Sequence, residues 1–309
     1  MRKKNLFFIQ LLFCFLCIPA ISNAQQPLQV VSSFSILTDL VEQVGGEHVQ
    51  VYTLIKANTD AHSFEPSAQD ARHLSGAQLV FANGLEFEPW LGRLTRASGF
   101  QGMTVLVSNG IVPLKIDGDE HEHESGHHEH EHEHGEYDPH AWQNVLNVVI
   151  YVQNIASALA QADPVHTEYY EKRAHDYIRE LHALDTDISN SMKEIPRERR
   201  ILVTAHDSFA YFADRYELTT FSALGVTNEA LPSAAGIAQL IRQIRSQHIP
   251  ALFLEKNINP RILEQVIRET NAVLGGSLYT DALSPEGTQA DSYVKMMRAN
   301  LTTLLNTFH

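Results

Sequence analysis

Residues 165–195 contain neither glycine nor proline, and this uninterrupted stretch constrains the fold more than any other feature of the chain. Pro164 and Pro196 bound it on its two sides. Its apolar side chains recur at spacings of three and four residues, as on one face of a helix: Tyr170, Ala174, Tyr177, Ile178, Leu181, Leu184 and Ile188. At 1.5 Å per residue, a helix over 164–196 would be about 45 Å long, which exceeds a short crossover. We therefore predict one rigid helix that links two lobes.

Short β-rich runs alternate with helical patterns on both sides of this helix. Such alternation predicts parallel sheets flanked by helices. The fold class expected is therefore α/β, with an N-terminal lobe over 25–163 and a C-terminal lobe over 197–309. The runs expected to form strands are LQVVSSF, VQVYTLI, QLVFANG and MTVLVSN in the first lobe, and RILVTA, TTFSAL, ALFLE and GSLYT in the second.

Residues 1–24 have the pattern of a secretory signal peptide. Three basic residues precede an apolar run, and the small residues Ser22 and Ala24 frame a cleavage site. Both cysteines of the chain, Cys14 and Cys17, fall in this segment. Leu16 stands where a bacterial lipoprotein needs a small residue, which argues against lipid anchoring. We therefore expect a periplasmic protein that is released by cleavage after Ala24.

Any metal site after residue 24 must be built from His, Asp and Glu, because no cysteine follows that point. The net charge of −14 argues against nucleic-acid binding and favours cations. The segment 117–136 is rich in His and Glu and lacks an apolar anchor, so we expect a disordered loop. This loop should bind zinc weakly, in interchangeable arrangements, through His121, His123, His127, His128, His130, His132 and His134.

Four other side chains lie at the ends of predicted strands or at the start of a predicted helix, where the backbone can hold a metal ligand in a fixed position. His62, His206 and Asp281 follow predicted strands, and His140 opens a helix after Pro139. Ligands of open parallel sheets bind outside the carboxyl ends of the strands. His62 and His140 belong to the first lobe, whereas His206 and Asp281 belong to the second. A cleft between the lobes would therefore bring all four together. The alternatives are surface histidines and an aspartate that caps a helix.

The segments around these residues resemble the ligand motifs of a known family. In chain order they are DAHSFEPS, DPHAW, TAHDSFAYF and LYTDALS. With the linking helix and the His-rich insertion, they are similar to the metal-binding solute-binding proteins of bacterial zinc/manganese ABC importers (cluster A-I), zinc branch. The resemblance spans nearly the whole mature chain. It implies a metal held between two α/β lobes by His62, His140, His206 and Asp281. Ala61 departs from the proline that is frequent in the family, but this removes no donor.

The donor set favours zinc as the bound ion. Three imidazoles and one carboxylate suit Zn²⁺, whereas Mn²⁺ prefers more oxygen ligands. Manganese and iron members of the family often carry glutamate where this chain has His206. Mn²⁺ or another divalent ion is the alternative. Histidine ligands usually donate their second N–H to a carboxylate or carbonyl, and the candidates for this role are Glu65, Asp138, Asp207 and Glu255. Glu65 or Glu255 would alternatively enter the coordination shell of the metal.

Two classes of function fit such a site. The first is a monomeric binding protein that captures extracytoplasmic zinc and delivers it to the membrane permease of an ABC importer, without nucleic acid or a small organic substrate. The second is a zinc hydrolase, with three protein ligands and a metal-bound water. The HExxH pattern occurs only inside the His-rich segment, within residues 123–134, and none of the four candidate ligands belongs to it. Asp281 would fill the position that a hydrolase leaves open. We therefore expect transport and no enzymatic activity. A manganese- or iron-binding member of the same family is a further alternative.

Overall fold

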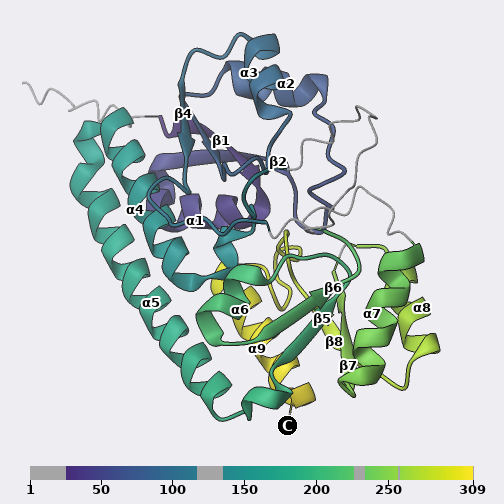
Figure 1. The fold of residues 1–309 in the computed structure, drawn as a ribbon. Helices are drawn as coiled ribbons and strands as arrows, with labels where there is room; N and C mark the ends of the chain where they lie inside the picture. The colour runs from purple at the N-terminus through teal and green to yellow at the C-terminus, as the bar shows by residue number, and fades with distance from the viewer. Residues whose placement is uncertain (1–25, 117–134, 226–233, 257, 309) are drawn as a thin grey trace, which may run out of the picture.

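The computed structural model describes residues 26–116, 135–225, 234–256 and 258–308, which form two lobes joined by one long helix (Figure 1). The signal peptide expected over 1–24 lies outside the described residues, as do all seven histidines of the His/Glu-rich segment. The described residues include four short 3-10 helices, at Gly46–His48, Ala141–Gln143, Pro164–His166 and Arg197–Arg199.

The N-terminal lobe is built on one parallel sheet with the strand order β2-β1-β3-β4. The four strands are β1 (Leu28–Phe34), β2 (Val49–Ile55), β3 (Leu79–Ala82) and β4 (Met103–Leu106). The helices of this lobe are α1 (Ser35–Gly45), α2 (Ala68–Ser75), α3 (Leu91–Ser98) and α4 (Val145–Ala162). Because the strands are parallel, their carboxyl ends share one edge of the sheet, and this edge faces the second lobe.

The C-terminal lobe contains two parallel strand pairs rather than one continuous sheet. The pairs are β5 (Ile201–Thr204) with β6 (Thr219–Ser222), and β7 (Ala251–Glu255) with β8 (Val273–Leu278). A side chain joins the two pairs at their carboxyl ends, because Glu255 Oε2 accepts hydrogen bonds from the main-chain N–H groups of Ala205 (2.8 Å) and His206 (3.1 Å). The helices of this lobe are α6 (Ala210–Tyr216), α7 (Ala234–Ser246), α8 (Arg261–Glu269) and α9 (Tyr293–Phe308).

The predicted linking helix is α5 (Thr167–Lys193), which runs along both lobes (Figure 1). All of the apolar face predicted for it is buried except Ile178, which is half-buried. Its Asp185 accepts hydrogen bonds from Arg215 Nε of α6 (2.9 Å) and from Tyr216 of the same helix (3.0 Å). Buried apolar contacts and a charged pair therefore attach α5 to the second lobe, which restricts bending between the lobes.

The hydrophobic core crosses from one lobe to the other. One cluster of buried side chains includes the N-terminal sheet, α1, α4, α5 and α9, and it also receives Leu202 of β5 and Phe253 of β7. A smaller cluster includes Val203 and Leu252 from the opposite faces of the same strands, packed against α7 and α8. Helix α4 is long and apolar enough to cross a membrane by composition, but α1 and α5 pack against it as they would against a core helix.

Candidate metal centre

The structure brings His62, His140, His206 and Asp281 together between the lobes. Each residue offers one donor atom, and the four donor atoms lie within 4.8 Å of one another. The Nε2 atoms of the three histidines each lie 3.5 Å from a carboxylate oxygen of Asp281. The side chains of His140 and His206 are completely buried, and those of His62 and Asp281 are 6 % exposed.

The three 3.5 Å separations, from His140 to Oδ1 of Asp281 and from His62 and His206 to Oδ2, are close to the edge of a tetrahedron around a small cation. Bonds of 2.0–2.1 Å from Zn²⁺ to nitrogen and oxygen imply donor–donor separations of about 3.4 Å. Several atoms of the cluster are also buried without a hydrogen-bond partner in the described structure, namely Nε2 of each histidine and Oδ1 of Asp281. Unpaired buried polar atoms are costly, so their convergence suits a positive ion in their midst.

His140 is oriented by a carboxylate from its own turn. Asp138 Oδ1 lies 2.7 Å from His140 Nδ1 and also accepts the main-chain N–H of His140 (2.8 Å). Asp138 is itself fixed from the other lobe, because the hydroxyl of Tyr211 on α6 donates to its carbonyl oxygen (2.9 Å). With Nδ1 hydrogen-bonded in this way, Nε2 of His140 is left free to face Asp281.

His206 is oriented by a carboxylate from another strand. Glu255 Oε1 lies 2.5 Å from His206 Nδ1 and accepts the hydroxyl of Ser208 (3.2 Å). The second oxygen of Glu255 accepts the two main-chain N–H groups that join the strand pairs. Both oxygens of Glu255 are therefore committed to the protein, and the carboxylate acts behind the histidine rather than beside Asp281.

The other two candidate carboxylates have different surroundings. Glu65 is exposed to solvent, whereas the side chain of His62 is only 6 % exposed. Asp207 is half-buried, and its main-chain N–H donates to the carbonyl of Gly225 (3.0 Å). Burial and the nearby charge of Asp138 raise the pKa of Asp207. The loop of His62 is instead braced by Asp60, whose Oδ1 accepts the main-chain N–H of His62 (3.1 Å).

Opposite charges in the buried cluster shift two pKa values strongly. Burial opposes a charge on His206, but the negative charges of Glu255 and Asp281 prevail and raise the pKa of His206 well above its usual range. Burial likewise opposes a charge on Asp281, yet the neighbouring imidazoles of His140 and His206 hold its pKa well below the usual range. The carboxylate of Asp281 is therefore kept ionised, as a metal ligand must be.

The aromatic ring of Phe87, from the N-terminal lobe, lies beside two histidines of the cluster. The ring of Phe87 lies 5.9 Å from the ring of His62 and 6.4 Å from that of His140. Phe87 follows a turn in which both Leu85 and Glu86 have positive φ, at 53° and 62°, a rare conformation for side chains of this size. Glu88 holds this turn by accepting two main-chain N–H groups, and burial raises the pKa of Glu88 to about 7.

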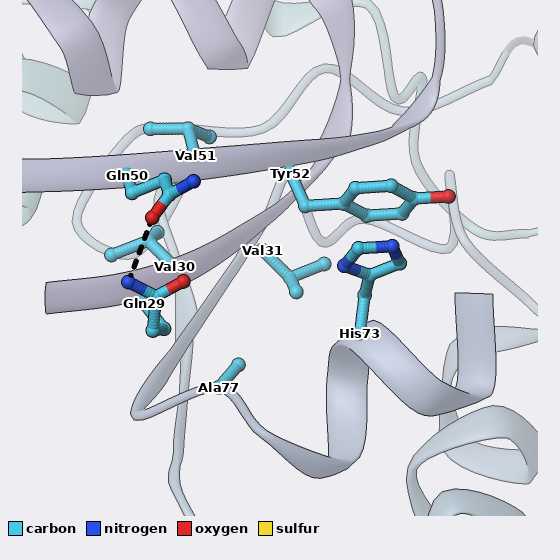
Figure 2. Close-up of a pocket in the computed structure, with 8 residues that line it drawn as sticks. All are labelled: Gln29, Val30, Val31, Gln50, Val51, Tyr52, His73 and Ala77. Atoms are coloured by element: carbon cyan, nitrogen blue, oxygen red, sulfur yellow. Dashed lines mark hydrogen bonds between the residues drawn. The ribbon is translucent and has the colours of Figure 1, made fainter. Parts of the chain in front are cut away.

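A separate pocket lies on the sheet of the N-terminal lobe, away from the carboxyl ends of its strands. Figure 2 shows its lining, with Gln29 and Gln50 joined by a hydrogen bond (3.0 Å) and the ring of His73 stacked against Tyr52. Its volume is about 140 Å³, and it is lined by Gln29, Val30, Val31, Gln50, Val51, Tyr52, His73 and Ala77. Since no carboxylate lines it, the pocket offers one imidazole and neutral groups, which is a poor set for a divalent ion.

Several residues of the centre are not among the sequence predictions. Tyr211 and Asp60 fix ligand loops, and Trp142, Gln143 and Thr280 connect His140 to Asp281. Trp142 belongs to the segment DPHAW, so it was adjacent to a recognised motif. Asp60 likewise lies in the segment DAHSFEPS, two residues before His62. The contacts of Tyr211, Gln143 and Thr280 join residues that are far apart in the chain, and a single sequence carries no signal for them.

Comparisons with known proteins agree on one family. Residues 30–307 match the family described as "Zinc-uptake complex component A periplasmic". The metal ABC transporter substrate-binding lipoprotein ScbA of Streptococcus cristatus is 30 % identical over 97 % of both chains. The manganese ABC transporter substrate-binding lipoprotein PsaA of Streptococcus pneumoniae is 30 % identical over 95 % of this chain and 94 % of its own.

Solved structures give the same result. The periplasmic zinc-binding protein TroA of Treponema pallidum superposes with a TM-score of 0.82 at 27 % identity, over 92 % of this chain and 99 % of that one. A manganese-bound periplasmic metal-binding protein of Candidatus Liberibacter asiaticus gives 0.79 at 28 % identity, over 91 % and 99 %. The predicted two-lobed α/β fold with a connecting helix is thereby confirmed.

Proposed function

The chain belongs to the zinc-uptake complex component A family of periplasmic substrate-binding proteins of ABC metal transporters, and from that premise we propose that it captures Zn²⁺ and delivers it to a membrane permease. Members of this family are substrate-binding proteins and not enzymes, so the prediction that the chain is not an enzyme is confirmed and the hydrolase alternative is dropped. The expected permease partner follows from the family, whereas a monomeric state is our proposal.

The buried cluster of three imidazoles and one carboxylate carries this proposal. We propose His62, His140, His206 and Asp281 as the ligands of a single ion. Support comes from three Nε2 atoms that each lie 3.5 Å from the carboxylate of Asp281, a spacing suited to tetrahedral coordination. A site saturated by four protein donors leaves no open position for a reacting water.

The choice of zinc over manganese rests on the number of oxygen donors. The names of relatives include both metals, so they do not decide the ion. Asp281 is the one carboxylate of the four-residue cluster. Glu255, the buried carboxylate nearest to His206, is occupied by hydrogen bonds to the protein. Manganese prefers more oxygen ligands than such a centre supplies, whereas a nitrogen-rich tetrahedral set suits zinc.

Metal analysis tests the function and the ligands together. Protein purified from its own periplasm should contain one tightly bound zinc, and competition among Zn²⁺, Mn²⁺ and Cu²⁺ should place Zn²⁺ well above Mn²⁺. His140→Ala should weaken zinc binding more than about 100-fold, because a lost ligand costs more than a lost supporting group. His175→Ala, an exposed position on α5, is the matched control. Equal losses in the two variants, or preferential retention of manganese, would refute the assignment.

The chain acts outside the cytoplasm, as its family does. Whether it is released there or anchored by a lipid is a separate question, and we propose that it is released. Curated relatives are named lipoproteins, which conflicts with the expectation that lipid anchoring is absent. Leu16 before Cys17 still supports a protein cleaved after Ala24 and released. Mass spectrometry of the mature N-terminus tests this directly, since a lipid-modified Cys17 and a free Gln25 differ greatly in mass.

A further inference from the structure

The carbonyl group next to Asp281 is held by two side chains that come from beside His140. Thr280 O accepts hydrogen bonds from Trp142 Nε1 (2.9 Å) and from Gln143 Nε2 (3.0 Å). Both donors lie in the 3-10 helix that directly follows His140. All three residues are buried, with Trp142 and Gln143 at 0 % exposure. The hydrogen bonds therefore cross from one lobe to the other beside the metal centre.

This arrangement restrains the loop that carries Asp281. A carbonyl oxygen has two lone pairs, and the two donors occupy both. If the loop moved away, a buried indole N–H and a buried amide N–H would lose their partner at the same time, and such losses are costly. The main chain at Thr280 is therefore fixed relative to the segment of His140.

Gln143 gains little for folding in exchange for its burial. Its Oε1 atom is buried and has no hydrogen-bond partner in the described structure. An amide that is buried with its carbonyl oxygen unpaired stabilises the fold less than an apolar side chain of similar size. The burial of the Gln143 amide is thus better explained by its hydrogen bond to the carbonyl of Thr280 than by a contribution to the stability of the core.

We propose that Gln143, together with Trp142, is a positioning residue for Asp281. The pair ties the neighbour of one ligand to the neighbour of another, so that the 3.5 Å separation between His140 Nε2 and Asp281 Oδ1 exists before a metal ion arrives. Ligands held in place beforehand lose less conformational entropy on binding, which raises affinity. The inference rests on the proposed function, since it concerns the same ligands.

The first test compares Gln143→Leu with a control that removes amide hydrogen bonds to main-chain carbonyls away from the ligands. Gln143→Leu should leave the Tm of the metal-free protein unchanged or higher, weaken Zn²⁺ binding about 10-fold, and alter the visible absorption spectrum of the Co²⁺-loaded protein. Asn154→Leu on α4 is the control, because Asn154 Nδ2 also donates to two main-chain carbonyls, of Val107 and Asn109 (2.8 Å each), away from the ligands. It should lower Tm and leave affinity and spectrum unchanged.

A second measurement follows the loop itself by hydrogen exchange. In the wild-type protein, peptides that cover 278–284 should be protected equally without and with Zn²⁺. In Gln143→Leu they should gain protection only when Zn²⁺ binds. Gln143→Met, which keeps the side-chain length and removes the donor, serves if leucine prevents folding. The positioning role is refuted if these variants keep wild-type affinity, Co²⁺ spectrum and exchange. If the wild-type protein binds no Zn²⁺ at all, the proposed function fails instead.

Discussion

His140 and His206 are both completely buried and both backed by a buried carboxylate, but the two carboxylates reach them by different routes. Asp138 is two residues from His140, within the same turn. Glu255 is 49 residues from His206, and it also connects the two strand pairs of its lobe. The first arrangement can form locally, whereas the second requires the C-terminal lobe to be assembled. Similar support for the two histidines therefore places different demands on the fold.

The largest difference between the two carboxylates should appear in the unfolding free energy when each is replaced by alanine. Glu255→Ala would leave two main-chain N–H groups and His206 without their buried partner, which should cost about 3–5 kcal/mol of unfolding free energy. Asp138→Ala loses contacts within one turn and should cost about 1–3 kcal/mol. Urea unfolding of the metal-free proteins measures both. Equal losses would show that Glu255 does not hold the strand pairs together.

Conservative replacements of the two carboxylates should have similar effects on zinc affinity. Glu255→Gln and Asp138→Asn keep the shape of each side chain but remove the negative charge behind the histidine. Both should weaken zinc binding about 10–100-fold, as is typical for groups that orient a metal-binding histidine. Competition with a chelator of known affinity gives the ratio. The comparison breaks down if one of the two variants binds like the wild-type protein.

The stability of the metal-free protein should depend on pH through His206. The pKa of His206 is raised, so its contribution is fully present below the ordinary value of 6.5 and is lost as pH rises through the raised value. Asp281 contributes in the opposite sense, because its pKa is lowered. Its contribution to stability is fully present above the ordinary pKa of 3.8 and is lost as pH falls through the lowered value. Unfolding free energy should thus decline as pH rises above about 6.5.

Zinc should abolish this decline, because the ion takes the place of the proton. Zinc affinity should accordingly fall as pH decreases below the raised pKa of His206. His206→Gln should flatten the pH dependence of the metal-free protein. Glu88→Gln is a necessary companion, since the pKa of Glu88 near 7 also lowers stability as pH rises. A pH profile that is unchanged by His206→Gln would contradict this account.

The smallest effect on the tight site is expected from the His/Glu-rich segment. Deletion of residues 119–136, with Asp138, Pro139 and His140 retained, should leave one tightly bound zinc per chain and reduce the total number of ions bound. We hypothesise that this segment collects zinc under scarcity, so growth in zinc-depleted medium should suffer. Loss of the tight site on deletion would mean that the segment itself supplies the ligands.

The sequence predicted most of the architecture because the relevant signals are local. The alternation of strand and helix patterns and the uninterrupted run that forms α5 each lie within one segment. Three of the four candidate ligands were found because strand ends mark one edge of a parallel sheet, and His140 because it opens a helix. The four side chains do lie together in the structure. Asp138 and Glu255 were candidates for similar reasons, one by adjacency and one as the end of a strand.

The remaining features depend on contacts that the sequence does not encode locally. Glu65 is near His62 in sequence, yet the loop turns it toward solvent. The division of the C-terminal sheet into two pairs, with Glu255 between them, could not be read from strand patterns alone. The hydrogen bonds from Trp142 and Gln143 to Thr280 join residues 138 and 137 positions apart. Such pairs become visible only in three dimensions.

The absence of cysteine after residue 24 has a consequence for redox chemistry. Thiolate ligands lose zinc when they are oxidised to disulfides or sulfenic acids. Imidazole and carboxylate ligands do not undergo these reactions, so a His₃Asp centre should retain its ion under oxidants that would empty a thiolate site. Treatment with hydrogen peroxide or a disulfide-forming catalyst should therefore release no zinc, which suits a protein that works in an oxidising compartment.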